Sequence, residues 1–427
     1  MAGIPDSPDG VSWRIVLLAS LGGTLEFYDF VVFGIFAKDI ADAVFPSSSP
    51  LASLMASFAA FAVGYLARPI GGIVLSHFGD RYGRRRVFLG SVFVMSAATL
   101  GMGLVPSYAR WGASASVVMV SLRLLQGLCL GGELPGALTY VVETAPRVAP
   151  FACGVVFACV TMGVAVATGV SVLVRTWLEP ASVATYGWRI ALVLGGLGGV
   201  LSFVLRRSLE ESPAFERLKV RHPFIELLRT RPVHVLVGVA ALAGTACFNG
   251  LFFSHLPAYL AAVLHYDARQ AVLAQTAGVI ASSTSILLTG WIGGRIAPRY
   301  LLRTGVGLLL VFAYPFYAAL EARALGLTAI LVLGGVSAGF ANGSFAVLLT
   351  DLFPTRIRFT GVALVFNVAF TIFSGMAPLA ATTLIRETGS LASPAFLMMG
   401  SASLTLLGSL WLERYGGEVL SASTRRD

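Results

Sequence analysis

Long apolar runs, repeated along the whole chain, constrain this sequence more than any other feature. A helix needs roughly twenty apolar residues to cross the hydrocarbon core of a bilayer. Runs of about this length cover residues 13–36, 51–76, 87–106, 115–142, 150–174, 188–206, 233–262, 270–293, 304–320, 326–350, 359–385 and 391–412. They are continuous and do not alternate with polar residues, so they predict membrane-spanning helices and not the strands of a barrel.

The composition excludes the ordinary soluble classes of protein. Hydrophobic residues make up 56% of the 427 residues and charged residues only 12%, whereas a soluble domain carries about 25% charged residues. A disordered chain would need few apolar residues and many charges. We therefore predict an all-α integral membrane protein with twelve transmembrane helices.

Cysteines and the N-terminal segment indicate neither a metal site nor a cleaved leader. The four cysteines lie inside apolar runs without the spacing of a zinc site, so we interpret them as small packing residues, and we predict no metal and no cofactor. The segment before the first run has no basic residue, which is atypical of a signal peptide. We interpret the first run as a retained span.

The basic residues predict the orientation of the chain in the membrane. The formal net charge is +9. When both termini are assigned to one side, most of the lysines and arginines fall on that side, which the positive-inside rule places in the cytoplasm. The charge is therefore a topology signal, and no soluble basic face indicates binding to nucleic acid. We predict a multi-pass protein of a bacterial inner membrane, monomeric, in contact with lipid, protons and a small-molecule substrate.

One long polar segment divides the chain into two halves. Residues 207–232 are charged and amphipathic, and we interpret them as a partly helical cytoplasmic linker between a six-helix unit at 1–206 and a six-helix unit with a short tail at 233–427. The halves echo each other weakly, since ETAPRVAPFACG at 143–154 resembles DLFPTRIRFTG at 351–361. Repeated halves with a binding site between them are typical of transporters.

Five motifs resemble the major facilitator superfamily and, within it, the metabolite:proton symporters. The motifs are LEFYDF at 25–30, RPIGGIVLSHFGDRYGRRR at 68–86, RLLQGLCLGGELPGA at 123–137, RRSLEESPAF at 206–215 and LFPTRIRFTGVALVFN at 352–367. The resemblance covers nearly the whole chain. It implies the fold of this superfamily, with two pseudo-symmetric six-helix halves, and a proton-coupled carrier for small metabolites, commonly carboxylates or compatible solutes. Ser76 stands where the loop motif of the family usually has glycine. Gly294 and Pro298 replace the usual acidic and basic residues of the second-half copy of this motif, which puts the second-half latch in question.

Ionisable residues inside the predicted spans are candidates for proton coupling, because a charge at mid-bilayer costs roughly 2.5–3.5 kcal/mol on insertion scales. The set comprises Glu26, Asp29, Arg68, Arg123 and Glu133. Asp29 and Arg123 lie at similar depths, about 10 to 12 Å below the outer end of their spans at 1.5 Å per residue. We predict that they form an ion pair that an arriving proton or substrate breaks. The alternative is a static pair that holds two helices together.

Two further groups of charges have a functional and a structural interpretation. Arg68 and Glu133 lie at similar depth near the cytoplasmic side and could form a second pair, or simply connect helices. The loop after the second span resembles the conformational latch of the superfamily, through Asp80, Arg81, Arg84 and Arg85. The same arginines would equally serve as a plain cytoplasmic anchor.

Amides and aromatic residues of the second half are typical of a small-molecule site. We predict a substrate site formed by Arg123, Gln126, Tyr28, Phe248, Asn249 and Asn367. Each asparagine, with Asn342 among them, could instead connect helices through hydrogen bonds. His255 precedes Pro257 near the outer end of the seventh span, and we interpret it as an end-of-helix residue and not as a coupling site.

These features favour secondary active import of a small polar organic solute with protons. The chain contains no GxxxxGK[ST] motif for binding ATP. The main alternative is a proton-driven exporter of a metabolite, siderophore or drug. A membrane sensor has no support from an extra signalling domain, and an enzyme has none from a nucleophile–base pair. The substrate stays open between an anionic carboxylate and a zwitterion such as a betaine or proline.

Overall fold

The computed structural model describes residues 13–415 except 48, 83, 145 and 207–222. For some helical residues, among them Glu26, Glu133 and those between 76 and 88, it describes the backbone and not the side chain. Within the described residues the chain is helical and has no strand, so the predicted all-α fold class is confirmed. Ten helical segments of this described part are long and apolar enough to cross a membrane. The other two predicted spans are α1 (Trp13–Ile35) and the Leu89–Leu104 part of α4.

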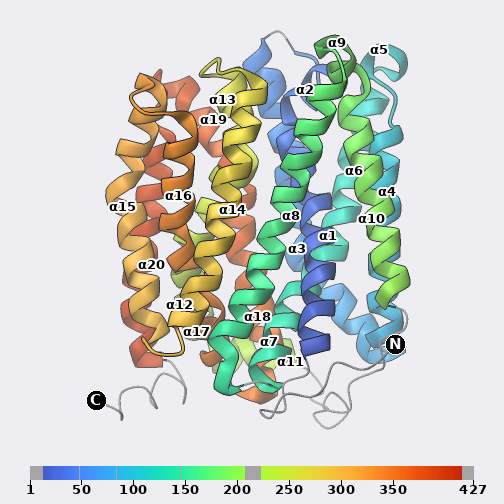
Figure 1. Ribbon diagram of the computed structural model, residues 1–427. Coiled ribbons are helices and arrows are strands. Elements are labelled where there is room, and N and C mark those ends of the chain that lie inside the picture. Colours follow the sequence, from blue (N-terminus) through green and yellow to red (C-terminus); the bar gives the residue numbers. More distant parts are fainter. Residues whose placement is uncertain (1–12, 48, 83, 145, 207–222, 416–427) are drawn as a thin grey trace.

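The first six spans form one side of the bundle (Figure 1). After α1 they are α3 (Pro50–Tyr82), α4 (Arg84–Leu104), α6 (Ala113–Cys129) continued through η1 (Leu130–Gly132) into α7 (Glu133–Thr144), α8 (Ala149–Trp177) and α10 (Trp188–Arg206). Short helices connect them, namely α2 (Ala37–Val44), α5 (Tyr108–Trp111), η2 (Pro146–Val148), α9 (Pro180–Ser182) and η3 (Val183–Gly187).

The last six spans form the other side of the bundle. They are α12 (Pro232–Phe248) continued through η5 (Asn249–His255) into α13 (Leu256–Ala262), α14 (Ala268–Ile292), α15 (Pro298–Ala322), α16 (Leu327–Asn342) with α17 (Phe345–Asp351), α18 (Thr355–Ala369) continued through η6 (Phe370–Gly375) into α19 (Ala377–Thr388), and α20 (Pro394–Tyr415). The amphipathic α11 (Pro223–Thr230) precedes α12. The segments η5 and η6 are π-helical turns within their spans.

Proline explains several of the helix starts. Pro50, Pro180, Pro232, Pro298 and Pro394 are each the first residue of their helix. Proline suits this position because its missing N–H would have no partner there, and its fixed φ already matches the helix. The hydropathy pattern places the start of the sixth span at 188, yet the helical segment begins at Pro180, because the polar first turn is helical without being apolar.

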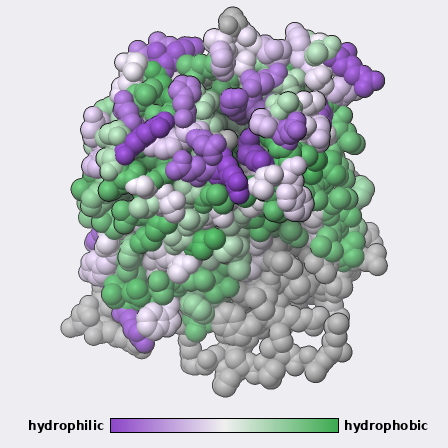
Figure 2. Space-filling model, turned by 45° about the horizontal axis from the view of Figure 1, so that its top comes forward, coloured by the Kyte–Doolittle hydropathy of each residue, from purple (hydrophilic) through white to green (hydrophobic). Residues whose placement is uncertain are grey.

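The two ends of the bundle differ from its flank in polarity. The start of α1 and the end of α20 lie at one end, which we name the proximal end, and the opposite end is the distal end (Figure 1). Figure 2 shows hydrophilic residues gathered over the distal end and apolar residues over the flank. Large apolar side chains such as Leu104, Val311 and Leu333 are exposed on that flank. An exposed apolar belt is the surface that a lipid bilayer covers.

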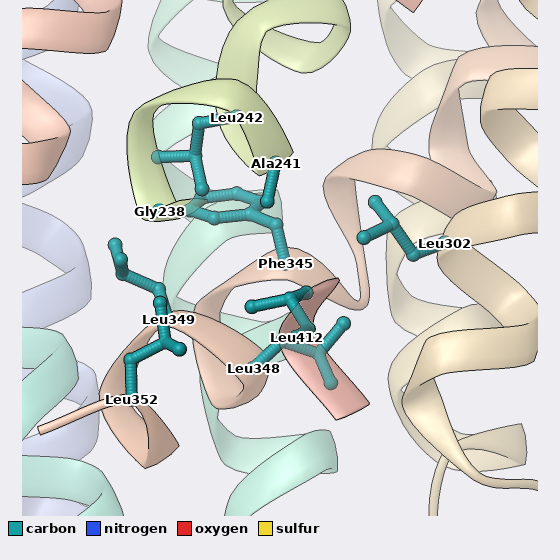
Figure 3. Close-up of a pocket in the computed structure, with 9 residues that line it drawn as sticks. All are labelled: Gly238, Ala241, Leu242, Leu302, Phe345, Leu348, Leu349, Leu352 and Leu412. Atoms are coloured by element: carbon teal, nitrogen blue, oxygen red, sulfur yellow. The ribbon is translucent and has the colours of Figure 1, made fainter. Parts of the chain in front are cut away.

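Apolar packing seals the proximal part of the second half. A gap there has no room for a water molecule. The residues that line it are Gly238, Ala241, Leu242, Leu302, Phe345, Leu348, Leu349, Leu352 and Leu412 (Figure 3). Large aliphatic side chains from α12, α15, α17 and α20 interlock around Phe345 (Figure 3). This region is structural core, so polar chemistry in the second half has to lie elsewhere.

Candidate functional site

The second and fourth spans approach closely at glycine residues, and this approach positions Arg123. A Cβ added to Gly127 on α6 would overlap the backbone carbonyl of Gly64 on α3. A Cβ at Gly64 would in turn lie 3.0 Å from Nε of Arg123. Two helices can pack at this distance only where neither carries a side chain. The glycines therefore leave the space in which the guanidinium group of Arg123 lies.

Arg123 is fully buried and is held by neutral groups. Its Nη1 donates to Oε1 of Gln126 at 2.5 Å, and its Nη2 donates to the backbone oxygen of Phe30 at 3.0 Å. The guanidinium carbon lies 3.9 Å from the ring centroid of Phe30 and 4.8 Å from the centroids of Phe33 and Phe61. Aromatic faces stabilise a desolvated cation by about 2 kcal/mol. The arginine thus occupies an aromatic cage with acceptors on two sides.

Gln126 extends this network to the first and third spans. Its Nε2 donates to the backbone oxygen of Asp29 at 3.3 Å and to Oγ1 of Thr99 at 2.8 Å. Arg123 and Gln126 lie one helical turn apart on α6, so both reach α1 at neighbouring carbonyl groups. Side chains of the motif at 123–137 therefore contact backbone oxygens of the motif at 25–30.

The Asp29 carboxylate does not form the predicted ion pair with Arg123. It faces α10, because a Cβ on Gly195 would overlap Oδ1 of Asp29 and a Cβ on Gly199 would lie 3.2 Å from Oδ2. Arg123 has no carboxylate within 4 Å among the described residues. The depth of Asp29 and Arg123 in the membrane does not determine in which direction around the helix axis each side chain points. The α1 helix turns its carbonyl groups to α6 and the Asp29 side chain to α10.

Tyr28 also faces α10. Its hydroxyl donates to the backbone oxygen of Ala191 at 2.8 Å, and its ring edge lies next to Gly195. The side chain is buried within the first half. The structure therefore shows a helix-packing contact of Tyr28, and its predicted contact with substrate stays a prediction.

Arg68 connects the cage to the second half. Its guanidinium carbon lies 5.5 Å from the ring of Phe30, 5.2 Å from the ring of Tyr65 and 5.9 Å from the ring of Phe366 on α18. Phe30 therefore lies between the two buried arginines of the first half. The side chain of Glu133, the predicted partner of Arg68, lies outside the described part of the chain, as does that of Glu26.

The eleventh span is hydrogen-bonded to the first half at three points. Nδ2 of Asn367 donates to the backbone oxygen of Gly131 at 2.5 Å, in the 3₁₀ segment η1 where the α-helical bonding pattern of the fourth span changes. Oγ1 of Thr371 donates to the backbone oxygen of Tyr65 at 2.7 Å. Oγ of Ser374 donates to the hydroxyl group of Tyr65 at 3.2 Å. Asn367, predicted to bind substrate, here connects the two halves.

Asn249 pairs with Asn342 in the second half. Nδ2 of Asn249 donates to Oδ1 of Asn342 at 2.9 Å and to the backbone oxygen of Thr245 at 2.7 Å. Its neighbour Phe248 stacks on Phe252, with ring centroids 4.7 Å apart. Phe248 also lines an apolar cavity of about 330 Å³ between η5, α15 and α16, on the flank of the bundle. Phe248 therefore faces this flank, and Asn249 connects its span to α16 through Asn342.

His255 lies between the halves near the distal end. Only 1% of its surface is exposed. Its ring lies 5.6 Å from that of Phe58 on α3, and its Nε2 lies 3.3 Å from Oγ1 of Thr382 on α19. Interpreting it as a helix-end residue missed this contact, because hydropathy cannot indicate that η5 and α3 meet. Phe58 also packs in a small apolar cluster with Ala37, Leu54 and Ala258.

The two halves also meet at the proximal end, through an ion pair that the sequence analysis missed. Nη1 of Arg358 lies 3.0 Å from Oε1 of Glu143. The two residues belong to the repeated segments 143–154 and 351–361, so the repeat was the signal that could have found the pair. The predicted latch side chains of Asp80, Arg81, Arg84 and Arg85 lie outside the described part. Among the described residues no group of three or more metal-ligating side chains occurs.

Sequence comparisons place this arrangement among known transporters. A profile of the Major Facilitator Superfamily matches residues 19–378. The chain is 32% identical over 415 residues to a citrate-proton symporter of Klebsiella pneumoniae, covering 96% of this chain and 93% of that one. It is 30% identical to a putative proline/betaine transporter of Staphylococcus aureus, covering 93% and 86%. It is 28% identical to the proline/betaine transporter of Escherichia coli, covering 97% and 86%.

Solved structures agree on the fold. A proton:xylose symporter superposes with a TM-score of 0.76 at 16% identity, covering 94% of this chain and 95% of that one. A bacterial homologue of the lysosomal transporter Spinster superposes with a TM-score of 0.66 at 17% identity. At these identities the likeness concerns the fold alone. The chain is a membrane transporter and not an enzyme, and it belongs to the Major Facilitator Superfamily, within the metabolite:proton symporter family.

Proposed function

We propose that this transporter imports a small organic carboxylate together with protons. The observation that carries the proposal is Arg123, a fully buried cation whose hydrogen-bond partners among the described residues are neutral. A buried charge without a counter-ion is costly, and an anion that enters the site would remove much of this cost. Nε of Arg123 has no hydrogen-bond partner among the described residues. The relatives named for citrate and proline transport agree with a carboxylate substrate.

Asp29 is the proposed proton acceptor. Its side chain is fully buried, and its backbone oxygen accepts a hydrogen bond from Gln126, which in turn binds Arg123. Protonation removes the charge of the carboxylate next to Gly195 and Gly199, so α1 and α10 can shift relative to each other. A shift of α1 would move the carbonyl groups that hold Gln126 and Arg123. Glu26 and Glu133 remain proposed contributors to the proton pathway.

Alternating access would follow from rocking of the two six-helix halves. In this proposal the halves are residues 1–206 and 233–427, and 207–232 link them in the cytoplasm. The contacts of Phe58 with His255 and of Glu143 with Arg358 would open in turn, at the distal and proximal ends respectively. Asp80, Arg81, Arg84 and Arg85 would act as a latch at the proximal end. The transporter would work as a monomer in a bacterial inner membrane, with both termini in the cytoplasm.

Reconstitution into proteoliposomes tests the proposal. We expect an inward proton gradient to drive accumulation of a radiolabelled carboxylate, and an inverted gradient to prevent it. Asp29→Asn is expected to abolish accumulation driven by the gradient while exchange of labelled for unlabelled substrate continues. Arg123→Ala is expected to abolish both.

The alternative outcomes are distinct. Accumulation driven by an outward proton gradient would identify a proton antiporter, the main alternative function. Full accumulation in both variants would remove Asp29 and Arg123 from the mechanism. Thermal unfolding of each purified variant, compared with the unmodified chain, serves as the control for folding.

A further inference from the structure

The cavity between η5, α15 and α16 opens on the flank of the bundle. Its volume is about 330 Å³, and every residue that lines it belongs to the second half. Phe312, Leu325 and Leu333 form its rim, and between 53% and 60% of the surface of each is exposed. The rim therefore continues the exposed apolar belt that a lipid bilayer covers.

The far wall of the cavity lies deep inside the protein. It consists of Leu251 and Phe252 of η5 and of Leu256, the first residue of α13. At most 3% of the surface of each is exposed. A group that contacts these side chains therefore lies inside the cavity and not on the surface of the bundle.

Small residues leave this space open. Ala313 on α15 and Gly334 on α16 line it. A Cβ added to Gly334 would lie 2.8 Å from Cε2 of Phe316 and 3.3 Å from Cε2 of Phe252. The glycine thus makes room for two of the aromatic rings that form the wall, and the alanine adds only a methyl group to it.

The chemistry of the cavity selects an apolar occupant. Its lining carries no charge, and the hydroxyl group of Ser337 already donates to the backbone oxygen of Leu333. Apolar cavities stay dry, and one of about 150 Å³ is large enough to bind benzene. If this larger space were empty, the side chains around it would lose van der Waals contacts. An alkyl chain would restore these contacts, whereas a polar solute would lose its hydrogen bonds to water.

The dimensions of the cavity match one leaflet of a bilayer. On α15 the lining residues run from Leu308 to Ala319, a distance of about 16 Å at 1.5 Å per residue. Half of a hydrocarbon core of about 30 Å measures about 15 Å. The rim residue Leu325 follows α15 at the distal end (Figure 1), so the cavity extends from there to about the middle of the bundle.

We infer that this cavity binds an acyl chain of a phospholipid from the leaflet at the distal end. The chain lies between α15 and α16, with η5 as its inner wall. The other neighbours of η5 include α1 of the first half, and His255 of η5 lies against Phe58 of α3. The bound chain therefore lies behind the segment through which the two halves meet near the distal end.

Photo-crosslinking of the full-length chain in proteoliposomes tests the inference. The probe is a phosphatidylcholine that carries a photoreactive diazirine on one acyl chain. After illumination and digestion, mass spectrometry locates the residues that carry an adduct. We expect adducts on the far wall, at Leu251, Phe252 or Leu256, because a lipid that stays on the surface does not reach these buried side chains.

Two substitutions on α15 form a matched pair. Ala313→Phe places a ring inside the cavity and is expected to remove the adducts on the far wall, since two groups cannot occupy the same space. Val311→Phe adds the same ring at an exposed position that does not line the cavity, and it is expected to keep these adducts. Thermal unfolding shows whether each variant is folded. Ser337→Leu, which fills the cavity from α16, provides a second test if Ala313→Phe is not.

Three outcomes would overturn the inference. Adducts confined to the rim and to other exposed residues of the flank would show ordinary surface lipid. Adducts on the far wall that persist in the filled variants would show that the probe reaches these residues by another route. Labelling of the far wall by a diazirine-bearing free fatty acid, but not by the phosphatidylcholine, would identify a different occupant.

Discussion

The two halves of the transporter have the same architecture but surround different buried polar groups with it. The first half buries arginine side chains, which only donate hydrogen bonds, in a cage of aromatic rings. The second half buries neutral amides, and the oxygens of Asn249, Gln275 and Asn367 have no hydrogen-bond partner among the described residues. A charge responds to protonation nearby, while neutral amides select by geometry. The difference suggests that the first half carries the coupling to protons and the second half carries the choice of substrate.

The halves also differ in how their helices are built around these groups. Arg123 lies where α3 and α6 touch through glycine backbones, a contact with little room to adjust. Asn249 lies in the π-helical segment η5, and Asn367 lies close before η6. Single π-helical turns are frequent at functional sites, because they loosen the regular bonding of a helix. The arginine is thus held rigidly, whereas the amides lie at places where a span can change shape.

The contrast between the halves would fail first if the positive charge of Arg123 were sufficient for uptake without the geometry of its guanidinium group. Arg123→Lys keeps the charge but cannot contact Gln126 and the Phe30 carbonyl together with a substrate, since lysine lacks the planar fork. We expect uptake efficiency to fall about 100-fold or more, as for truncation of a buried hydrogen-bonded charge. Initial uptake rates over a range of substrate concentrations measure this. A lysine variant with nearly full activity would show that the fork geometry is unimportant.

The position of the Asp29 carboxylate gives the next largest effect. Gly195→Ala would place a methyl group onto that carboxylate, and a crowded site of this kind costs about 1–3 kcal/mol. We expect accumulation driven by protons to fall about 10-fold. Gly198→Ala is the matched control, since its new methyl group would be in ordinary contact with Leu25 at 3.4 Å. Equal behaviour of the two variants would argue against a role for the contact between Asp29 and α10.

The ion pair between Glu143 and Arg358 tests how strongly the halves are connected. Glu143 is 36% exposed and Arg358 is 19% exposed at the side chain, so the pair contributes about 0–1 kcal/mol. We expect Glu143→Gln to change the uptake rate by up to about 5-fold. The exchange of both residues, Glu143→Arg with Arg358→Glu, should restore much of the rate. If each single variant and the exchange behave identically, the pair does not hold the halves together.

Tyr28 gives the smallest expected effect. Tyr28→Phe removes the hydrogen bond to Ala191, which contributes about 0.5–1.5 kcal/mol to stability. We expect a small fall in unfolding temperature and a KM for uptake within about 2-fold of the unmodified chain. A large rise in KM without a loss of stability would instead show that Tyr28 contacts the substrate, as predicted from the sequence.

Much of the fold could be predicted from the sequence, and less of the site. The spans were correct to within a few residues for most helices, because lipid requires both length and hydrophobicity in each one. The sequence also singled out Arg123, Gln126, Asn249 and Asn367, which the structure places in buried polar contacts. It missed the partners of these residues. Hydropathy gives the depth of a residue and leaves open which neighbour its side chain faces.

The division of roles between Asp29 and its neighbour Phe30 illustrates this limit. The two residues are adjacent in LEFYDF, yet one turns its side chain to α10 and the other supplies its carbonyl to Arg123. Neither direction follows from composition or spacing. Both follow from which helices pack against α1, and that depends on the glycines of α6 and α10.

The amino-acid sequence alone determined that this chain crosses a bilayer many times and belongs to a transporter family, because burial in lipid and family motifs are properties of local segments. The tertiary structure decided that, within the described residues, the buried Arg123 is bound by neutral groups and that the amide oxygens of Asn249, Gln275 and Asn367 have no hydrogen-bond partner. The physical reason is that hydrogen bonds depend on distance and direction between helices, and those are set only when the helices pack.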